Sequence, residues 1–271
     1  MSDFFDNHVG TAPNYLSRKA RLIGSCKDLL AELDVGTKRR LRRWDAKFAN
    51  AAPQRILAVG IEVPGREADL TAVMDRLKRF SRHHFEVCVG PMQAGLGKFA
   101  NITAALVGTD PSAYDWLMLV DDDIAFGAEM LDRLIGFTLE ADFWVSQPAH
   151  LLGSNASYQV TLRNARSLAR ETSFVEIGPL TLVKRAAFGD LLPFPDSRWC
   201  YGIDIAWSEA ATNNGWKMGI IDGAPIKHLR PVAGSYSADA ARAEGLAYVK
   251  GLNVTRSRAE ILGFEQITVP S

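Results

Sequence analysis

Residues 115–126, DWLMLVDDDIAF, join an apolar run to three consecutive carboxylates. Side chains alternate along a strand, so Asp121 and Asp123 point to one face of the strand end and Asp122 points to the other. Ionised carboxylates at the end of a buried strand repel one another and are costly to desolvate unless a cation or hydrogen-bond donors compensate them. A divalent metal and the hydroxyl groups of a ribose would do so. The pattern therefore predicts a ligand site at Asp121 and Asp123.

A simpler interpretation is that these aspartates are ordinary polar residues in a loop between a strand and a helix. One of them would then cap the helix that is expected to begin near Gly127. A cap stands immediately before its helix, whereas Asp123 lies four residues short of Gly127. We therefore favour the ligand site.

The elements that must position this site follow a regular alternation. From residue 55 onward, short apolar runs alternate with segments of helical periodicity. Strands are expected at 56–63, 85–89, 115–120 and 142–148, with helices at 66–83, 97–108 and 127–140. Such repetition predicts an α/β fold with a mainly parallel sheet, right-handed crossovers and helices on both faces. Ligands of such sheets collect at the carboxyl ends of the strands, where the aspartates lie.

Beyond residue 148 the pattern is looser. Further strands are expected at 158–164, 174–183 and 216–222, and a helix is expected within 197–215. The segment 237–264 has helical character, with a break at Gly251. We divide the chain into an N-terminal helical, basic extension at 1–50, a catalytic domain at 51–235 and a C-terminal helical segment at 236–271.

An apolar strand closed by Asp-x-Asp, about halfway along a chain of this size, resembles the nucleotide-sugar glycosyltransferases of the GT-A fold, particularly the inverting family 2 type. The resemblance implies a Rossmann-like GT-A domain. It also implies that Asp121 lies near the ribose of the donor and that Asp123 binds the metal bridging the two donor phosphates. Lys98 and Asn101, in GLGKFANITAAL, occupy places that face the nucleotide in that family. A cation in a first helical turn suits a diphosphate.

The base-binding end of the donor site matches the family less well. Many members carry an acidic residue after the second strand, and FEVCVGPMQAG has none. After the first strand, Glu62, Val63 and Pro64 stand where the family contacts the nucleotide base. Glu62 is therefore a candidate donor-binding residue, and the identity of the base is left open.

The segment around Asp204 resembles the part of the family that carries the catalytic base. A Gly-x-Asp there opens a helix, and aromatic residues flank it: Trp199, Tyr201 and Trp207. The resemblance makes Asp204 the base that deprotonates the acceptor hydroxyl, with Glu209 as second choice. The alternative is that Asp204 only caps its helix.

His228 follows the strand expected at 216–222 and lies 24 residues after Asp204. Its order and spacing match the histidine that completes the metal site in many relatives. Carboxylate and imidazole together suit Mn²⁺ or Mg²⁺, which would act as a Lewis acid on the leaving nucleotide diphosphate. Arg230, and also Lys227, would add positive charge beside it.

The chain is thus expected to be a metal-dependent inverting glycosyltransferase that moves a sugar from a nucleotide-diphosphate sugar to a hydroxyl acceptor. The acceptor would be a glycan or a lipid-linked saccharide, as in polysaccharide biosynthesis. One alternative is a phosphatase of the haloacid dehalogenase type, whose Asp-x-Asp normally opens the domain and is followed two residues on by Thr or Val, where Ala125 stands here. Another is a nucleotide-sugar-binding protein without catalysis.

Composition sets outer limits on these functions. Lys plus Arg and Asp plus Glu are 31 each, so no global charge steers the chain toward nucleic acid. Three widely spaced cysteines build no disulfide framework. No apolar stretch reaches the roughly 18 to 20 residues of a membrane span or resembles a signal peptide. We expect a cytoplasmic protein.

Residues 16–48 form a helix-prone and amphipathic segment. A basic run lies within it: Lys38, Arg39, Arg40, Arg42 and Arg43. The simplest interpretation is a solvated helix lying on the core domain. The alternative is a peripheral contact with anionic lipid at the inner face of the membrane, with Leu41, Trp44 and Phe48 on the other side of the same helix.

Overall fold

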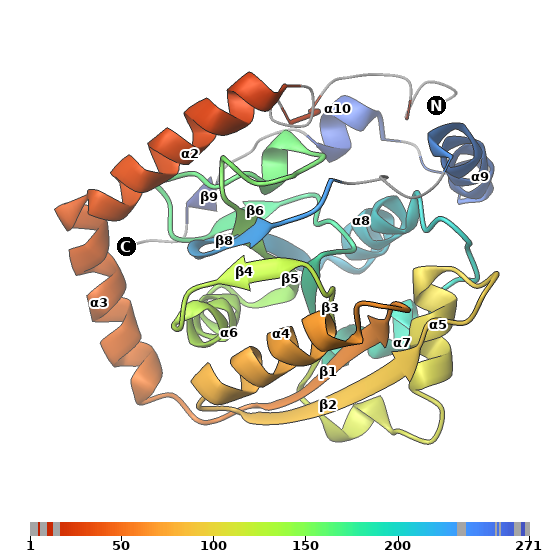
Figure 1. Cartoon of the computed structure of the whole chain (residues 1–271), viewed down its shortest axis with the longest axis horizontal. Helices are drawn as coiled ribbons and strands as arrows, with labels where there is room; N and C mark the ends of the chain where they lie inside the picture. The colour runs from red at the N-terminus through yellow and green to blue at the C-terminus, as the bar shows by residue number, and fades with distance from the viewer. Residues whose placement is uncertain are drawn as a thin grey trace.

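A nine-stranded sheet covered by helices forms the body of the protein (Figure 1). The computed structural model describes residues 5, 10–12, 17–231, 237–252, 254, 256–262 and 267–268. The helices are α2 (Arg18–Leu33), α3 (Val35–Ala49), α4 (Glu67–Phe80), α5 (Lys98–Ala105), α6 (Met130–Glu140), α7 (Phe188–Leu191), α8 (Ile203–Asn214), α9 (Ala238–Gly251) and α10 (Arg258–Ile261). The strands are β1 (Arg55–Glu62), β2 (His84–Pro91), β3 (Trp116–Val120), β4 (Ile124–Phe126), β5 (Phe143–His150), β6 (Arg170–Thr172), β7 (Leu180–Lys184), β8 (Lys217–His228) and β9 (Ile267–Thr268).

The long strands of the sheet are mainly parallel, as expected. The strand order is β2-β1-β3-β7-β5-β8-β6-β9, and β4 pairs with β8 off this path. Strand β1 pairs in parallel with β2 and β3, and β5 pairs in parallel with β8. Strand β7 runs antiparallel to both β3 and β5, so β1, β2, β3, β5 and β8 all point the same way. Their carboxyl ends therefore share one edge of the sheet.

Alternation along the strands builds an apolar layer on each face of the sheet. In β1, Ile56 and Ala58 belong to one buried cluster, and Leu57 and Val59 belong to the other. Helices α3, α4 and α6 contribute to the first cluster, and α5, α7 and α8 contribute to the second. The strands are apolar on both sides because both faces are covered, which is typical of parallel sheets.

The strand expected at 158–164 is wrong, because Gln159–Thr161 form a 3₁₀ turn. Tyr158 packs edge-on against Phe174 with 4.7 Å between ring centroids, and Val160 is buried in the same cluster. Tyr158 and Val160, two of the alternating apolar residues, therefore pack a loop against Phe174 instead of forming a strand. Periodicity over so short a segment does not distinguish that use from a strand.

Strand β6 was not expected from the sequence, and β8 continues beyond the expected strand at 216–222 to His228. Arg170 of β6 is buried, and its Nε lies 2.8 Å from Oδ2 of Asp222 in β8. A buried arginine is rare without such a partner. An arginine is not expected in a buried strand, and its partner lies 52 residues away, so the local sequence did not indicate β6.

The N-terminal extension forms two helices instead of one. The break is at Asp34, whose carboxylate accepts a hydrogen bond from the backbone N–H of Thr37 and caps α3. The apolar side of α3 packs on α6: Leu41 and Phe48 are buried, and the rings of Phe48 and Phe137 lie 4.9 Å apart. The side chains that the lipid alternative had assigned to a membrane therefore belong to the core.

None of the described helices is both long enough and apolar enough to cross a membrane.

Candidate active site

A cleft of about 720 Å³ opens at the carboxyl ends of β1 and β3. It is lined by the loops after β1, β2 and β3, by the segment before β7, by the start of α8, by the end of β8 and by side chains of α9 and α10. This volume suits a small-molecule ligand. Six of the eight candidate catalytic, donor-binding and metal-binding residues line it: Lys98, Asn101, Asp121, Asp123, Asp204 and His228.

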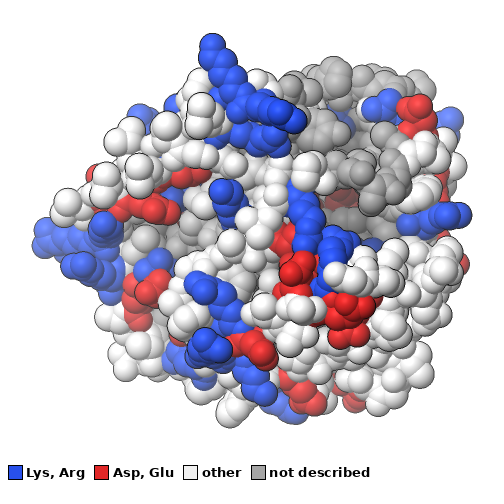
Figure 2. All heavy atoms as spheres, viewed as in Figure 1, with Lys and Arg blue, Asp and Glu red and all other residues white. Residues whose placement is uncertain are grey.

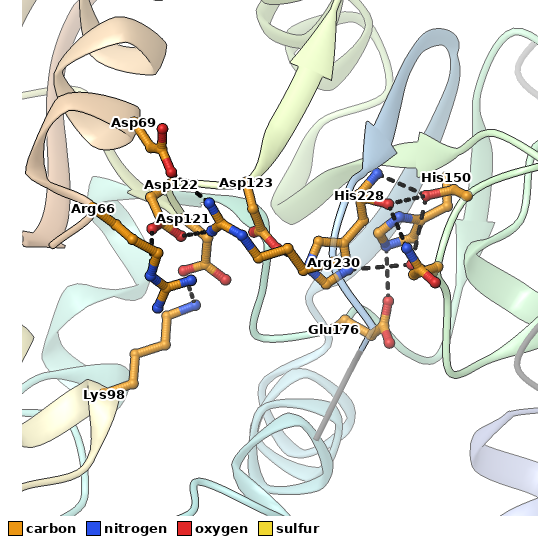
Figure 3. Close-up of polar contacts among 12 residues, drawn as sticks. Arg66, Asp69, Lys98, Asp121, Asp122, Asp123, His150, Glu176, His228 and Arg230 are labelled. Carbon is orange, nitrogen blue, oxygen red and sulfur yellow. Dashed lines mark hydrogen bonds and ion pairs between the residues drawn. The ribbon is translucent and has the colours of Figure 1, made fainter. Parts of the chain in front are cut away.

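Asp121 forms an ion pair with the first residue of α5. The Nζ of Lys98 lies 2.6 Å from Oδ1 of Asp121 and 3.4 Å from the carbonyl oxygen of Ile177 (Figure 3). Gly178 permits this approach, because a Cβ there would lie 2.6 Å from the Lys98 Nζ and 3.0 Å from Oδ2 of Asp121. The pair places one anion and one cation at the same wall of the cleft.

Asp123 is buried and forms an ion pair with His228. The Oδ2 of Asp123 lies 3.0 Å from Nε2 of His228, and β4 pairs with β8 at Ile124 and His228. Burial acts to raise the pKa of Asp123, but the hydrogen bond and the charge of His228 outweigh it and lower that pKa. Burial acts to lower the pKa of His228, and Asp123 in turn raises it. The other ring nitrogen, Nδ1, lies 3.2 Å from the carbonyl oxygen of Asn155, which orients the imidazole.

The pair formed by Asp123 and His228 fits two ligands of a divalent cation. One supplies a hard oxygen and the other an imidazole nitrogen, a set that suits Mn²⁺ or Mg²⁺. Asp121 is instead turned to Lys98, and within the described residues no three acidic, His or Cys side chains converge as a ready cation site. A bound cation would therefore have coordination positions left for a substrate or for water, as catalytic metal ions do.

Asp122 also lines the cleft, but its carboxylate pairs with arginines instead of with Lys98 or His228. It lies 3.0 Å from Nη1 of Arg230 and 3.5 Å from Nε of Arg66 (Figure 3). Burial raises the pKa of Asp122, although both arginines act to lower it. Arg230 also pairs with Asp69, and it is not among the residues that line the cleft. Arg66 does line the cleft, and sequence reasoning missed it; its place just beyond the end of β1 was the available signal.

Asp204 lies at the start of α8 and is only 7% exposed. Its Oδ1 accepts a hydrogen bond of 2.9 Å from the backbone N–H of Ile205. Burial raises the pKa of Asp204 to about 7, and the charge of Glu176 adds to the increase while Arg258 opposes it. Gly202, with φ of +89°, makes the left-handed turn that starts the helix. A carboxyl group so placed can take up a proton near neutral pH.

The aromatic residues around Asp204 divide between cleft and core. Trp199 and Tyr201 line the cleft. Trp207 is buried, its ring lies 5.8 Å from that of Phe99, and it is not among the residues that line the cleft. Glu209, the second-choice base, pairs with Arg256 at 2.7 Å and is not among the lining residues.

Sequence reasoning also missed Glu176 and its partner His150. Glu176 lines the cleft, and its Oε2 lies 2.9 Å from Nε2 of the buried His150. The rings of His150 and His228 lie 6.1 Å apart. The charge of Glu176 also raises the pKa values of Asp204 and His228. A single glutamate within the apolar run FVEIGPLTLV was the signal in the sequence.

The remaining donor-site predictions have weaker geometric support. The side chain of Asn101 holds the loop before α5: its Oδ1 accepts from the N–H of Gln93 at 2.8 Å, and its Nδ2 donates to the carbonyl oxygen of Gly97 at 2.9 Å. Glu62 is not among the residues that line the cleft, whereas Val63 is. Contact of Asn101 or Glu62 with a nucleotide stays a prediction.

The fold, now described, is similar to that of known glycosyltransferases. The mannosyltransferase PcManGT from Pyrobaculum calidifontis, solved in complex with GDP-Man and Mn²⁺, superposes with a TM-score of 0.55 at 14% identity, over 90% of this chain and 79% of the other. TarS 1-349 from S. aureus, in complex with UDP-GlcNAc, gives a TM-score of 0.50 at 13% identity, over 77% of this chain and 69% of the other. No protein-family model and no curated protein matches the sequence.

These likenesses define the class of fold: the chain has the GT-A fold, with a curled, mainly parallel sheet. At such low identity they establish the fold alone, so the activity must be argued from the site.

Proposed function

We propose that this protein is a metal-dependent inverting glycosyltransferase, which moves a sugar from a nucleotide-diphosphate sugar to a hydroxyl group of a glycan or a lipid-linked saccharide. The observation that carries the proposal is the content of one cleft. It holds a carboxylate paired with an imidazole, Asp123 and His228, and a separate buried carboxyl group, Asp204, whose pKa is near 7. The first pair suits a cation and the second group suits a proton.

The donor would lie between β1, the start of α5 and Asp121. In this arrangement Asp123 and His228 would hold a Mn²⁺ or Mg²⁺ ion, which would supply Lewis-acid stabilisation of the leaving diphosphate. Lys98 places a cation at the N-terminus of α5, where the helix dipole also favours an anion. Asp121 would then release Lys98 to the phosphates and accept hydrogen bonds from the ribose.

The acceptor would enter from the side of Trp199 and Tyr201, whose rings can pack on the apolar faces of a sugar. Asp204 accepts the proton of the acceptor hydroxyl as its oxygen bonds to the anomeric carbon. The bond from that carbon to the diphosphate oxygen breaks in the same displacement, and the nucleoside diphosphate leaves with the electron pair. One displacement from the opposite face inverts the anomeric configuration. A pKa near 7 suits a base that works at neutral pH.

The phosphatase alternative has less support from this geometry. A haloacid dehalogenase uses the first aspartate as a nucleophile, whereas here Asp121 is held by Lys98 at 2.6 Å. The fold is also GT-A. A protein that binds nucleotide sugars without catalysis shares the donor half of the cleft, but it has no use for a buried, protonatable Asp204.

The test is an assay of the full chain with a panel of UDP-, GDP- and dTDP-sugars, each with Mn²⁺ and with EDTA, followed by detection of the released nucleoside diphosphate. We expect slow, Mn²⁺-dependent release from one donor class, with the Asp75→Asn variant as a control because Asp75 is an exposed acid on α4. Release of phosphate from monoesters would instead support a phosphatase. Donor binding without any turnover, with acceptor saccharides present, would support the non-catalytic alternative.

A further inference from the structure

Helix α2 is oriented with its polar side toward the body of the protein. The carboxylate of Asp28 accepts hydrogen bonds from the N–H groups of Leu152 and Gly153, at 3.0 and 2.8 Å. Gly24 lies so close to the same loop that a Cβ there would be 2.2 Å from the carbonyl oxygen of Leu152. These contacts fix the rotation of the helix about its axis. The apolar side of α2 is therefore turned away from the core.

The outward side of α2 carries a stripe of large apolar residues. The exposed members are Leu22, Ile23, Leu29, Leu30, Leu33 and, just after the helix, Val35, with exposed fractions from 47% to 77%. They make up six of the thirteen large apolar side chains exposed in the described part of the chain. Leu22, Leu29 and Leu33 are spaced by seven and four residues, which places them on one face. A contiguous apolar stripe of this kind marks a surface that another body covers.

Positive charge accompanies this stripe. Residues 18–49 contain ten Lys and Arg and four Asp and Glu, in a chain whose totals are equal. On α3, Lys38, Arg39, Arg42 and Arg43 are exposed, because Leu41 and Phe48 occupy the opposite, buried side. Figure 2 shows Lys and Arg gathered at the left rim, where α3 follows α2 in Figure 1.

We propose that the outer face of α2 and α3, which we call the N-terminal rim, docks on an anionic lipid surface. The leucines of α2 enter the boundary between head groups and acyl chains, and the basic residues of α3 lie against the lipid phosphates. Helix α2 then lies in the membrane plane. A symmetric contact between two copies fits less well, because a two-fold axis would set the same basic surface against itself. This inference does not depend on the proposed function.

The membrane contact differs from the one that the sequence suggested. There the apolar residues were Leu41, Trp44 and Phe48 of the basic helix, which pack in the core. The basic residues keep their role, and the apolar part moves to the preceding helix.

The test is flotation of the full chain with vesicles of phosphatidylcholine, alone or mixed with phosphatidylglycerol. The apolar variant is Leu22→Gln/Leu29→Gln/Leu33→Gln, since glutamine preserves helix propensity. The charge variant is Arg39→Glu/Arg42→Glu. The matched controls are Val107→Gln, at a side chain that is 82% exposed, and Lys78→Glu/Arg79→Glu on α4. Circular dichroism and thermal unfolding check that every variant is folded.

We expect the wild type and both controls to float with the mixed vesicles and only weakly with phosphatidylcholine. The partition coefficient of the apolar variant into the mixed vesicles should be at least about tenfold lower than that of the wild type. The charge variant should also lose about tenfold at low salt, and wild-type binding should weaken as salt rises. Absence of flotation, or flotation that neither variant weakens, would overturn the proposal. The proposal would also be overturned if light scattering showed a dimer that the leucine substitutions dissociate and the protein did not bind vesicles.

Discussion

At one end of the cleft Asp123 keeps its charge although it is buried, because Nε2 of His228 lies 3.0 Å away and lowers its pKa. At the other end Asp204 is equally buried, but the charge of Arg258 offsets only part of the effect of burial, and its pKa rises to about 7. The first we call the metal end and the second the base end. The neighbours of each aspartate therefore shift its pKa in opposite directions, as the two roles in the proposed function require.

The comparison shows which observation distinguishes a carboxylate suited to bind a metal ion from one suited to act as a general base. A carboxylate that stays ionised can bind a cation, whereas one whose desolvation outweighs the nearby positive charge can accept a proton. Burial alone does not distinguish them, since both side chains are nearly inaccessible. The predictions below test the contrast from the largest expected effect to the smallest.

The largest effect is expected at the base end. Asp204→Asn should lower the rate of sugar transfer by about 10³-fold or more, because an amide cannot accept the acceptor proton. Donor affinity, measured by calorimetry with the nucleoside diphosphate and Mn²⁺, should stay within about threefold of wild type, since Asp204 does not contact the donor in our proposal. Full transfer activity of this variant would remove Asp204 from the role of base.

At the metal end, a substitution of Asp123 should lower activity by weakening the binding of the cation and the nucleotide. Asp123→Ala should lower transfer by about 10²- to 10³-fold, since it removes one cation ligand and leaves His228 without its partner. Unlike Asp204→Asn, it should also abolish the Mn²⁺-dependent part of nucleotide binding. The Asp75→Ala variant serves as the control. If Asp123→Ala binds Mn²⁺ and nucleotide normally, the metal end is wrongly placed.

The pH dependence of transfer should follow the base end. Asp204 must be ionised to accept a proton, so the rate should fall about tenfold per pH unit below its pKa near 7 and level off above it. At pH 5 the rate should be about 100-fold lower than at pH 8. Nucleotide binding measured over the same range separates this titration from that of the metal end. A flat profile from pH 5 to 8 would contradict the raised pKa of Asp204.

Stability should respond with opposite signs at the two ends. Because the folded-state pKa of Asp204 is raised, its contribution to stability is present below its unfolded pKa of 3.8 and is lost as pH rises through about 7. Asp204→Asn should therefore raise the free energy of unfolding by about 2–4 kcal/mol at pH 8, and by less at pH 5.

For Asp123 the folded-state pKa is lowered, so its contribution is present above the unfolded pKa and is lost as pH falls through the folded value. Asp123→Asn should accordingly lower the free energy of unfolding at pH 8, by about 1–2 kcal/mol. Thermal or urea unfolding of both variants at the two pH values is the measurement. Equal shifts of the same sign would show that the two carboxyl groups share one environment.

Much of this site could be predicted from the sequence because the signals are local. Alternation along the apolar strand 115–120 separated Asp122 from Asp121 and Asp123, and in the structure Asp122 pairs with two arginines, whereas Asp121 and Asp123 pair with a lysine and a histidine. The apolar periods of the segments that form α4 and α6 predicted helices that cover the sheet. Such features depend only on the spacing of neighbours in the chain.

Tertiary structure decided what depends on distant partners. Glu176 and His150 meet across 26 residues, and Arg170 finds Asp222 across 52, so no local pattern announces either pair. The orientation of α2 shows the same limit most plainly. Its leucines predict an amphipathic helix, but the contacts of Gly24 and Asp28 with the loop at 152–153 determine which side faces solvent. Periodicity defines the sides of a helix, and only packing against the rest of the chain selects the side that is buried.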